Sequence, residues 1–140
     1  MLPSNLWREI PQRYRLEAVF CPKCSTTYFP PRELCTECGS RELEKKKLPT
    51  KGKLVTYTVI HTPPKGFELY TPYIVGLVRL EDGTHITAQI TDADPNKLDL
   101  DVDVEAVIRK VKENGREGPI YYGYKFRPIL NANGAPERKC

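Results

Sequence analysis

The sequence predicts a mainly β protein, in which an N-terminal helical arm and a small metal-binding ribbon precede a five-stranded closed barrel. Two Cys-x-x-Cys pairs lie within residues 21–38. After residue 50, five segments rich in β-branched and aromatic residues alternate with turn signals. Ahead of the cysteines, apolar residues recur at helical spacing. We therefore expect an arm at 1–18, a ribbon at 19–48, a barrel at 49–130 and a flexible tail at 131–140.

Composition limits the class of protein. A chain of 140 residues can bury a real core, and 39% apolar with 29% charged residues is not the composition of a disordered or membrane-spanning chain. The start, MLPSNLWREIPQRYR, lacks the apolar core of a secretory signal. We expect a cytoplasmic protein whose thiols stay reduced. The net charge of +4 permits contact with phosphates without requiring it.

The arm is expected to begin with Ser4 as the N-cap of the helical segment NLWREI. Pro11 should end or kink this helix, and QRYRLEA could resume it. The apolar side of the arm consists of Leu6, Trp7, Ile10 and Tyr14. This side either packs on its own chain or docks on a partner subunit.

The cysteine segment CPKCSTTYFPPRELCTECGS carries the most specific chemistry. Its four thiols, from Cys21, Cys24, Cys35 and Cys38, can surround one metal ion tetrahedrally. Gly39 follows the second pair and suits a turn that points backbone N–H groups at sulfur, and Ser25 takes that place after the first pair. Four protein ligands leave no coordination position for a substrate, so the predicted role is structural.

Zinc is the metal that we predict, with iron, as in rubredoxin, and disulfide bonds as the alternatives. Only ten residues separate the two pairs, too few for a hydrophobic core. The metal must therefore largely hold this module together. Cys140, on the predicted tail, is interpreted as a free thiol without a role.

The barrel strands are expected at KLVTYTVIHT, PYIVGLVRL, THITAQI, DVDVEAVIRKVK and IYYGYKFRPI. Within THITAQI, Ile86, Ala88 and Ile90 alternate with polar residues, as in a strand with one buried face. Five such strands predict an OB-fold. Gly76, in the second strand, fits a bulge or a sharp bend, and for that reason a closed barrel is favoured over a sandwich.

Catalytic constellations are not visible. The two histidines, His61 and His85, are far in sequence from the three serines, so that no hydrolase triad is indicated. The acidic run DLDVDV lacks the glycine and glutamate of a calcium loop. The sequence predicts that the protein is not an enzyme.

A single-stranded nucleic-acid-binding protein is the alternative function. The basic residues for it would be Lys45, Lys46, Lys47, Lys51 and Lys53, although such a run is more often a solvated linker. The aromatic residues would be Tyr122, Tyr124 and Phe126 on one face of the last strand, with Tyr57 and Tyr73 nearby. The same aromatics could equally form a core or an interface.

The order of these segments resembles a known family. RYRLEAVFCPKCSTTYFPPRELCTECGS, followed by GKLVTYTVIH, PYIVGLVRLEDG and YYGYKFRP, is similar to the acyl-CoA-associated OB-fold proteins with a rubredoxin-like zinc ribbon. This is a family of unknown-function domains found with thiolases. The resemblance covers residues 5–130, and its most specific parts are FPPR at 29–32 and PYIVGLVRLEDG at 72–83.

The resemblance implies a non-catalytic scaffold subunit in a hetero-oligomer. An archaeal member of the family bridges acetoacetyl-CoA thiolase and hydroxymethylglutaryl-CoA synthase in the mevalonate pathway and helps to form their shared CoA channel. The resemblance also implies structural Zn²⁺ bound by the four cysteines. For CoA or acyl-CoA, we expect pantetheine contacts from Phe67, Tyr70 and Tyr73 and a phosphate contact from Lys65. Neither a membrane nor a nucleic acid is an expected partner.

Overall fold

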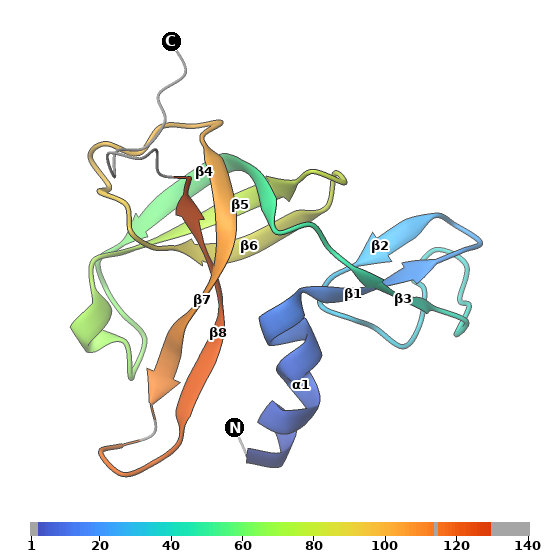
Figure 1. Cartoon of the computed structure of the whole chain (residues 1–140), viewed down its shortest axis with the longest axis horizontal. Coiled ribbons are helices and arrows are strands. Elements are labelled where there is room, and N and C mark those ends of the chain that lie inside the picture. The colour runs from blue at the N-terminus through green and yellow to red at the C-terminus, as the bar shows by residue number, and fades with distance from the viewer. Residues whose placement is uncertain (1–2, 114, 130–140) are drawn as a thin grey trace. The chain divides into compact units, whose positions relative to one another are not determined.

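The computed structural model describes residues 3–113 and 115–129, and these form two compact units that join at Pro49 and Thr50 (Figure 1). The first unit holds a helix and a three-stranded sheet, and the second is a closed five-stranded barrel. The predicted mainly β fold is therefore confirmed. The predicted tail, with Cys140, lies outside the described residues.

The arm forms one helix, α1 (Pro3–Arg15), which continues through Pro11 instead of ending there. Proline removes one N–H donor, but its fixed φ is compatible with a helix, and the Glu9–Arg13 ion pair of 2.6 Å spans this turn. The helix ends because Leu16 adopts a left-handed φ of 49°. Helix was therefore the wrong expectation for residues 17 and 18, which belong to the first strand. Among the described residues, no helix has both the length and the apolar character needed to cross a bilayer.

The ribbon sheet consists of β1 (Glu17–Cys21), β2 (Thr26–Tyr28) and β3 (Glu44–Lys47), in the order β2-β1-β3 with antiparallel pairing. The lysines of β3 were expected in a linker, but they pair with β1 in a register that joins Lys47 to Glu17. The ammonium of Lys46 lies 5.7 Å from the ring centroid of Phe20. Among the described residues of this unit, the buried apolar ones are few: Leu16, Ala18, Val19, Cys21, Cys35 and Leu48.

The barrel contains β4 (Lys51–Ile60), β5 (Tyr73–Leu80), β6 (His85–Ile90), β7 (Asp103–Glu113) and β8 (Ile120–Pro128), with the short 3-10 helix η1 (Glu68–Tyr70) before β5. The closed strand order is β4-β5-β6-β8-β7 (Figure 1), which confirms the predicted barrel and excludes a sandwich. The strands of the barrel are paired over unequal lengths. The parallel contact between β6 and β8 has the single register pair Ile90–Phe126, whereas β7 and β8 pair along most of their length.

The barrel interior is filled by alternate residues of each strand. Ile86, Ala88 and Ile90 are buried as predicted, and Leu54, Val78, Val104 and Phe126 have no exposed surface. Gly76 has a different role from the one predicted, because the irregular register of this strand pair lies in β4, between Leu54 and Thr56. A Cβ at Gly76 would lie 2.6 Å from the Leu54 Cδ1 atom, so that this glycine makes room for the interior side chains.

Candidate metal centre and ligand cavity

The four thiols of the ribbon converge on one point. The Sγ atoms of Cys21, Cys24, Cys35 and Cys38 all lie within 4.8 Å of one another. The Cys21 and Cys38 Sγ atoms are 3.7 Å apart. A tetrahedral site with metal–sulfur bonds of about 2.3 Å needs sulfur–sulfur distances of about 3.8 Å. This donor set therefore fits a four-cysteine metal site.

Two left-handed residues shape the turns that carry these thiols. Ser25 has a φ of 54° and Gly39 a φ of 67°, and each directly follows the second cysteine of its pair. In the second turn, the Gly39 N–H donates to the Cys35 carbonyl over 3.0 Å. The turn thereby folds the chain around the Cys35 sulfur, toward which the backbone N–H groups of Glu37 and Cys38 point.

The hydrogen bonds of the two central thiols differ. The Tyr28 hydroxyl and the N–H groups of Cys38 and Glu37 stabilise the Cys35 thiolate and lower its pKa to about 6. The pKa of Cys24 is raised to about 12, first by its hydrogen bond with the Cys38 thiol and then by desolvation. Cys35 is thus prepared as a thiolate by the protein itself, whereas a cation would have to stabilise the Cys24 thiolate.

Tyr28 is a residue of this site that the sequence reasoning missed. Its hydroxyl lies 3.3 Å from the Cys35 Sγ atom and 3.0 Å from the Thr36 Oγ1 atom. The Arg32 guanidinium lies 5.5 Å from the ring centroid of Tyr28. One sequence signal was available, because Tyr28 directly precedes the distinctive FPPR segment, whose last residue is Arg32.

The loop between β4 and β5 gathers the three aromatic residues proposed for CoA. The Phe67 ring centroid is 6.2 Å from that of Tyr70 and 6.0 Å from that of Tyr73. Glu68 fixes the loop by accepting the Gly66 N–H at 2.9 Å, and this bond lowers the pKa of its carboxyl group. Lys65 is exposed and forms no ion pair with the described residues.

A cavity of about 390 Å³ lies beside this aromatic cluster. It is lined by residues from the ends of β5 and β6, from the segment after β6, and from β7 and β8: Tyr70, Pro72, Tyr73, Ile74, Gln89, Ile90, Thr91, Asp92, Ala93, Pro95, Arg109, Lys110 and Lys125. We call it the Lys125 cavity, because this lysine is 7% exposed and is the most deeply buried charge in it. Lys65 does not line the Lys125 cavity. The cations that do line it were not selected by the sequence reasoning.

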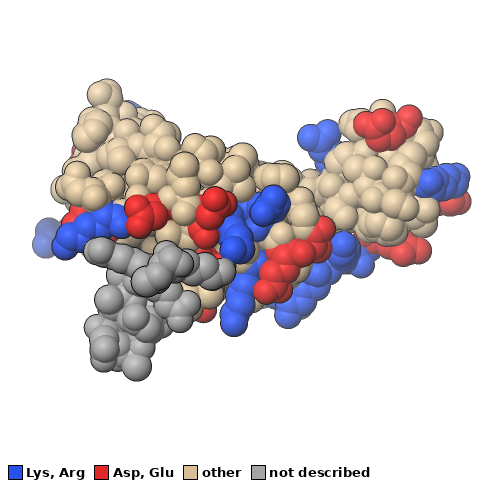
Figure 2. Space-filling model, turned by 90° about the horizontal axis from the view of Figure 1, so that it is seen from above, with Lys and Arg blue, Asp and Glu red and all other residues tan. Residues whose placement is uncertain are grey.

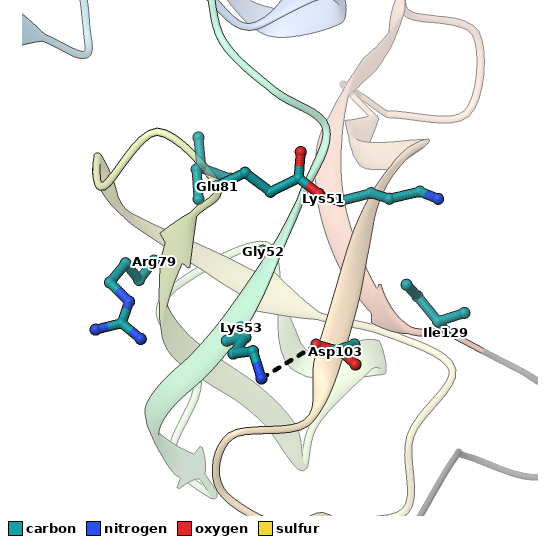
Figure 3. Close-up of a pocket in the computed structure, with 8 residues that line it drawn as sticks. Lys51, Gly52, Lys53, Arg79, Glu81, Asp103 and Ile129 are labelled. Carbon is teal, nitrogen blue, oxygen red and sulfur yellow. Dashed lines mark ion pairs between the residues drawn. The ribbon is translucent and has the colours of Figure 1, made fainter.

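A second cavity, of about 430 Å³, lies between β4, β5 and β7 on the barrel (Figure 3). Lys53 lines it and pairs with Asp103 over 3.6 Å. Lys51 and Arg79 also line it, but their side chains point away from each other (Figure 3). On the barrel face seen in Figure 2, acidic atoms lie between the basic ones. These cations do not form the continuous positive track that a nucleic-acid backbone needs.

The aromatic row proposed for base stacking is not available on β8. Phe126 is fully buried, Tyr124 is half-buried, and Tyr122 is 43% exposed. The Tyr124 and Phe126 rings pack edge to face, with centroids 6.2 Å apart. The Tyr57 hydroxyl donates to the Leu98 carbonyl at 2.8 Å, which is a structural contact. Tyr122 is the one aromatic residue of β8 that is more than 40% exposed, so this strand does not present the row of exposed rings that base stacking needs.

The fold and the thiol site together define a protein with two modules, a four-cysteine ribbon followed by an OB-fold barrel. Residues 8–44 match the rubredoxin-like zinc ribbon domain of ChsH2, and residues 45–109 match the C-terminal OB-fold domain of ChsH2. A DUF35 domain-containing scaffold protein of Methanocaldococcus jannaschii is 48% identical over 126 residues, 89% of either chain. The chain belongs to the DUF35 family.

Other relatives are subunits of enzymes. The benzoylsuccinyl-CoA thiolase subunit BbsA of Thauera aromatica is 32% identical over 81% of this chain and 76% of its own. Among solved structures, the Ltp2-ChsH2(DUF35) aldolase superposes with a TM-score of 0.69 at 28% identity, over 89% of this chain and 93% of the other. These similarities confirm the predicted family.

Proposed function

We propose that this chain is a non-catalytic scaffold subunit that bridges acetoacetyl-CoA thiolase and hydroxymethylglutaryl-CoA synthase in the mevalonate pathway. The observation that carries the proposal is its membership of a family in which a relative with 48% identity is named a scaffold protein. Support for an acyl-CoA enzyme as the partner comes from the thiolase subunit among its relatives. A shared CoA channel would let the synthase consume the product of the unfavourable thiolase condensation. We place the complex in the cytoplasm.

Zinc is the metal that we assign to the ribbon, with Cys21, Cys24, Cys35 and Cys38 as its ligands. The support is the spacing of the four sulfur atoms and the match to a zinc ribbon domain. A bound zinc ion would supply no chemistry to a substrate, because the four thiolates fill its coordination sphere. Its contribution is to hold the ribbon folded.

Exposed apolar side chains on both units support a role in protein contacts. On α1, Trp7 is 76% exposed. On the barrel, Leu69 in η1 is 93% exposed, and Ile108, Ile120 and Tyr122 on the β7–β8 hairpin are each more than 40% exposed. Large apolar and aromatic residues are the usual anchors of protein interfaces. We infer that α1 and the ribbon dock on one enzyme and the barrel docks on the other.

The CoA contacts remain as proposed from the sequence, with Phe67, Tyr70 and Tyr73 near the pantetheine arm and Lys65 near a phosphate. The support is that the three aromatic rings, which are half-buried, form one cluster at the end of the loop before β5 and at the first residue of that strand. The exposed position of Lys65 leaves it free to reach a ligand held by a partner enzyme.

Co-elution is the direct test of the bridge. The zinc-loaded chain is mixed with purified thiolase and synthase, and complexes are measured by size-exclusion chromatography with light scattering. We expect one ternary peak, which the two enzymes do not form without this chain. If the chain elutes alone at its monomer mass in the presence of both enzymes, the proposal is wrong.

A further inference from the structure

We propose that the Lys125 cavity is a phosphate-binding pocket whose ligand carries a diphosphate group. Lys125 provides the buried cation, and Arg109 and Lys110 add two more positive charges to the lining. The inference concerns the chain by itself and does not depend on the bridge. If the chain contacts CoA as proposed above, the diphosphate of CoA is one source of the ligand, and another nucleotide or free diphosphate is the other.

Lys125 is buried without a partner for its charge. The residue is 7% exposed, and none of the hydrogen bonds or ion pairs of the described residues includes its ammonium. Its recorded contact is with the Tyr70 ring, whose centroid lies 5.8 Å from Nζ. The Nζ atom is not fully enclosed, because every fully buried side-chain nitrogen in the described part of the chain has a hydrogen-bond partner. Lys125 and Tyr70 both line the cavity.

Burial of an unpaired ammonium is unfavourable, and this shows in its ionisation. Desolvation, followed by the nearby Arg109 charge, lowers the pKa of Lys125. The fold keeps a cation in this place although an apolar side chain would be easier to bury. An anion in the cavity would remove the conflict, because it would supply the missing counter-charge and accept hydrogen bonds from Nζ.

The charges around the cavity leave an excess of positive charge. Arg109, Lys110 and Lys125 line it, and Asp92 is the one carboxylate among the described lining residues. Glu113 does not line it, but its carboxylate pairs with Lys110 over 3.0 Å. Three positive charges less these two negative charges leave a net charge of +1. Asp92 is already shared, since its Oδ2 atom lies 3.2 Å from Arg109 and 3.9 Å from Arg127. The excess favours an anion, and a diphosphate offers more acceptor oxygens to the three cations than a carboxylate does.

The barrel topology explains why a ligand can enter here. The strands β6 and β8 share a single register pair, so the cavity lies where the sheet is least closed. On the other side of β8, Val107 pairs with Lys125, which places Arg109 two residues along the same face. The two cations therefore lie as diagonal neighbours on a rigid pair of strands, next to the open part of the barrel.

The test is titration of the isolated zinc-loaded chain with inorganic diphosphate at low ionic strength, followed by calorimetry and by amide NMR. We expect saturable binding, with the largest shifts at cavity residues such as Thr91 and Gln89. Lys125→Met keeps the aliphatic packing and removes the charge, and should weaken binding by about tenfold or more. Lys97→Met, at an exposed lysine that does not line the cavity, is the matched control and should bind diphosphate as the unmodified chain does.

Further ligands separate the possible sources. Binding of CoA but not of phosphate-free pantetheine, with CoA tighter than diphosphate, would identify CoA as the source, and equal affinity for ADP would identify nucleotides in general. The inference is overturned if diphosphate does not bind, if acetate binds as well as diphosphate, or if Lys125→Met lowers the affinity no more than Lys97→Met does. Lys125→Met should leave the ternary co-elution intact, so that failure of the pocket is distinguishable from failure of the bridge.

Discussion

Tyr28 shows how one side chain supports the thiol site without being a ligand. Its hydroxyl contacts both the Cys35 sulfur and Thr36, so that it fixes the orientation of the second cysteine pair. Groups in this position hold metal ligands in place and adjust their basicity. The four cysteines were predictable because their spacing is a local pattern. The contact of Tyr28 with Cys35 depends on how the segment after β2 turns back toward that strand, which the spacing does not encode.

Tyr28→Phe is expected to weaken zinc binding by about tenfold, within the range for such supporting groups. The physical reason is loss of the hydrogen bond that stabilises the Cys35 thiolate. Competition with a coloured zinc chelator measures the affinity. Tyr14→Phe is the control, because Tyr14 is an exposed tyrosine of α1. Equal affinities for the two variants would show that the Tyr28 hydroxyl is dispensable.

Among the elements, the barrel strands were the most predictable part of the fold. Alternation in β6 and the turn before it are local signals, and all five strands were placed from such signals. The end of α1 was harder, because Leu16 is left-handed and buried, and a left-handed leucine has no sequence signature. The sequence also did not predict β3 as a strand, because this lysine-rich segment forms a strand only through its pairing with β1.

The Lys125 cavity could not be predicted from the sequence. Its residues come from β5, the segment after β6, β7 and β8, which are far apart in the chain. Lys125 sits between aromatic residues in β8, and strand alternation alone does not distinguish an inward lysine from an outward one. The strand register and the narrow β6–β8 contact bring these side chains together.

Gly76 is a position of the barrel interior with little room for a side chain. Gly76→Ala would bring a methyl group against the side chains of Leu54 and Ile90, so we expect a loss of about 1–3 kcal/mol in the free energy of unfolding. Urea denaturation measures it. Thr87→Ala, at an exposed position of the neighbouring β6, should change stability by about 0.5 kcal/mol or less. An unchanged urea midpoint for Gly76→Ala would mean that the interior relaxes around the methyl group.

The ribbon should need its metal ion to stay folded, whereas the barrel should stay folded without it. Six buried apolar residues are a small core, whereas structural zinc contributes on the order of 10 kcal/mol to small zinc modules. Cys35→Ser is therefore expected to collapse the amide NMR dispersion of the ribbon and to leave that of the barrel unchanged. Cys140→Ser should retain both sets of signals. A dispersed ribbon spectrum after complete chelation would show that the apolar core suffices.

At the scale of the whole molecule, a bridge requires that its two ends bind different partners. Trp7→Ala removes the most exposed aromatic residue of α1, and Ile120→Asp places a charge on the exposed hairpin of the barrel. Each change should weaken one binary complex by about 30-fold, as expected for loss of an anchor residue, and leave the other complex intact. Size-exclusion chromatography of the chain with each enzyme separately measures this. Loss of the same enzyme in both variants would mean that the two units form one docking surface, and the ternary complex would then need another explanation.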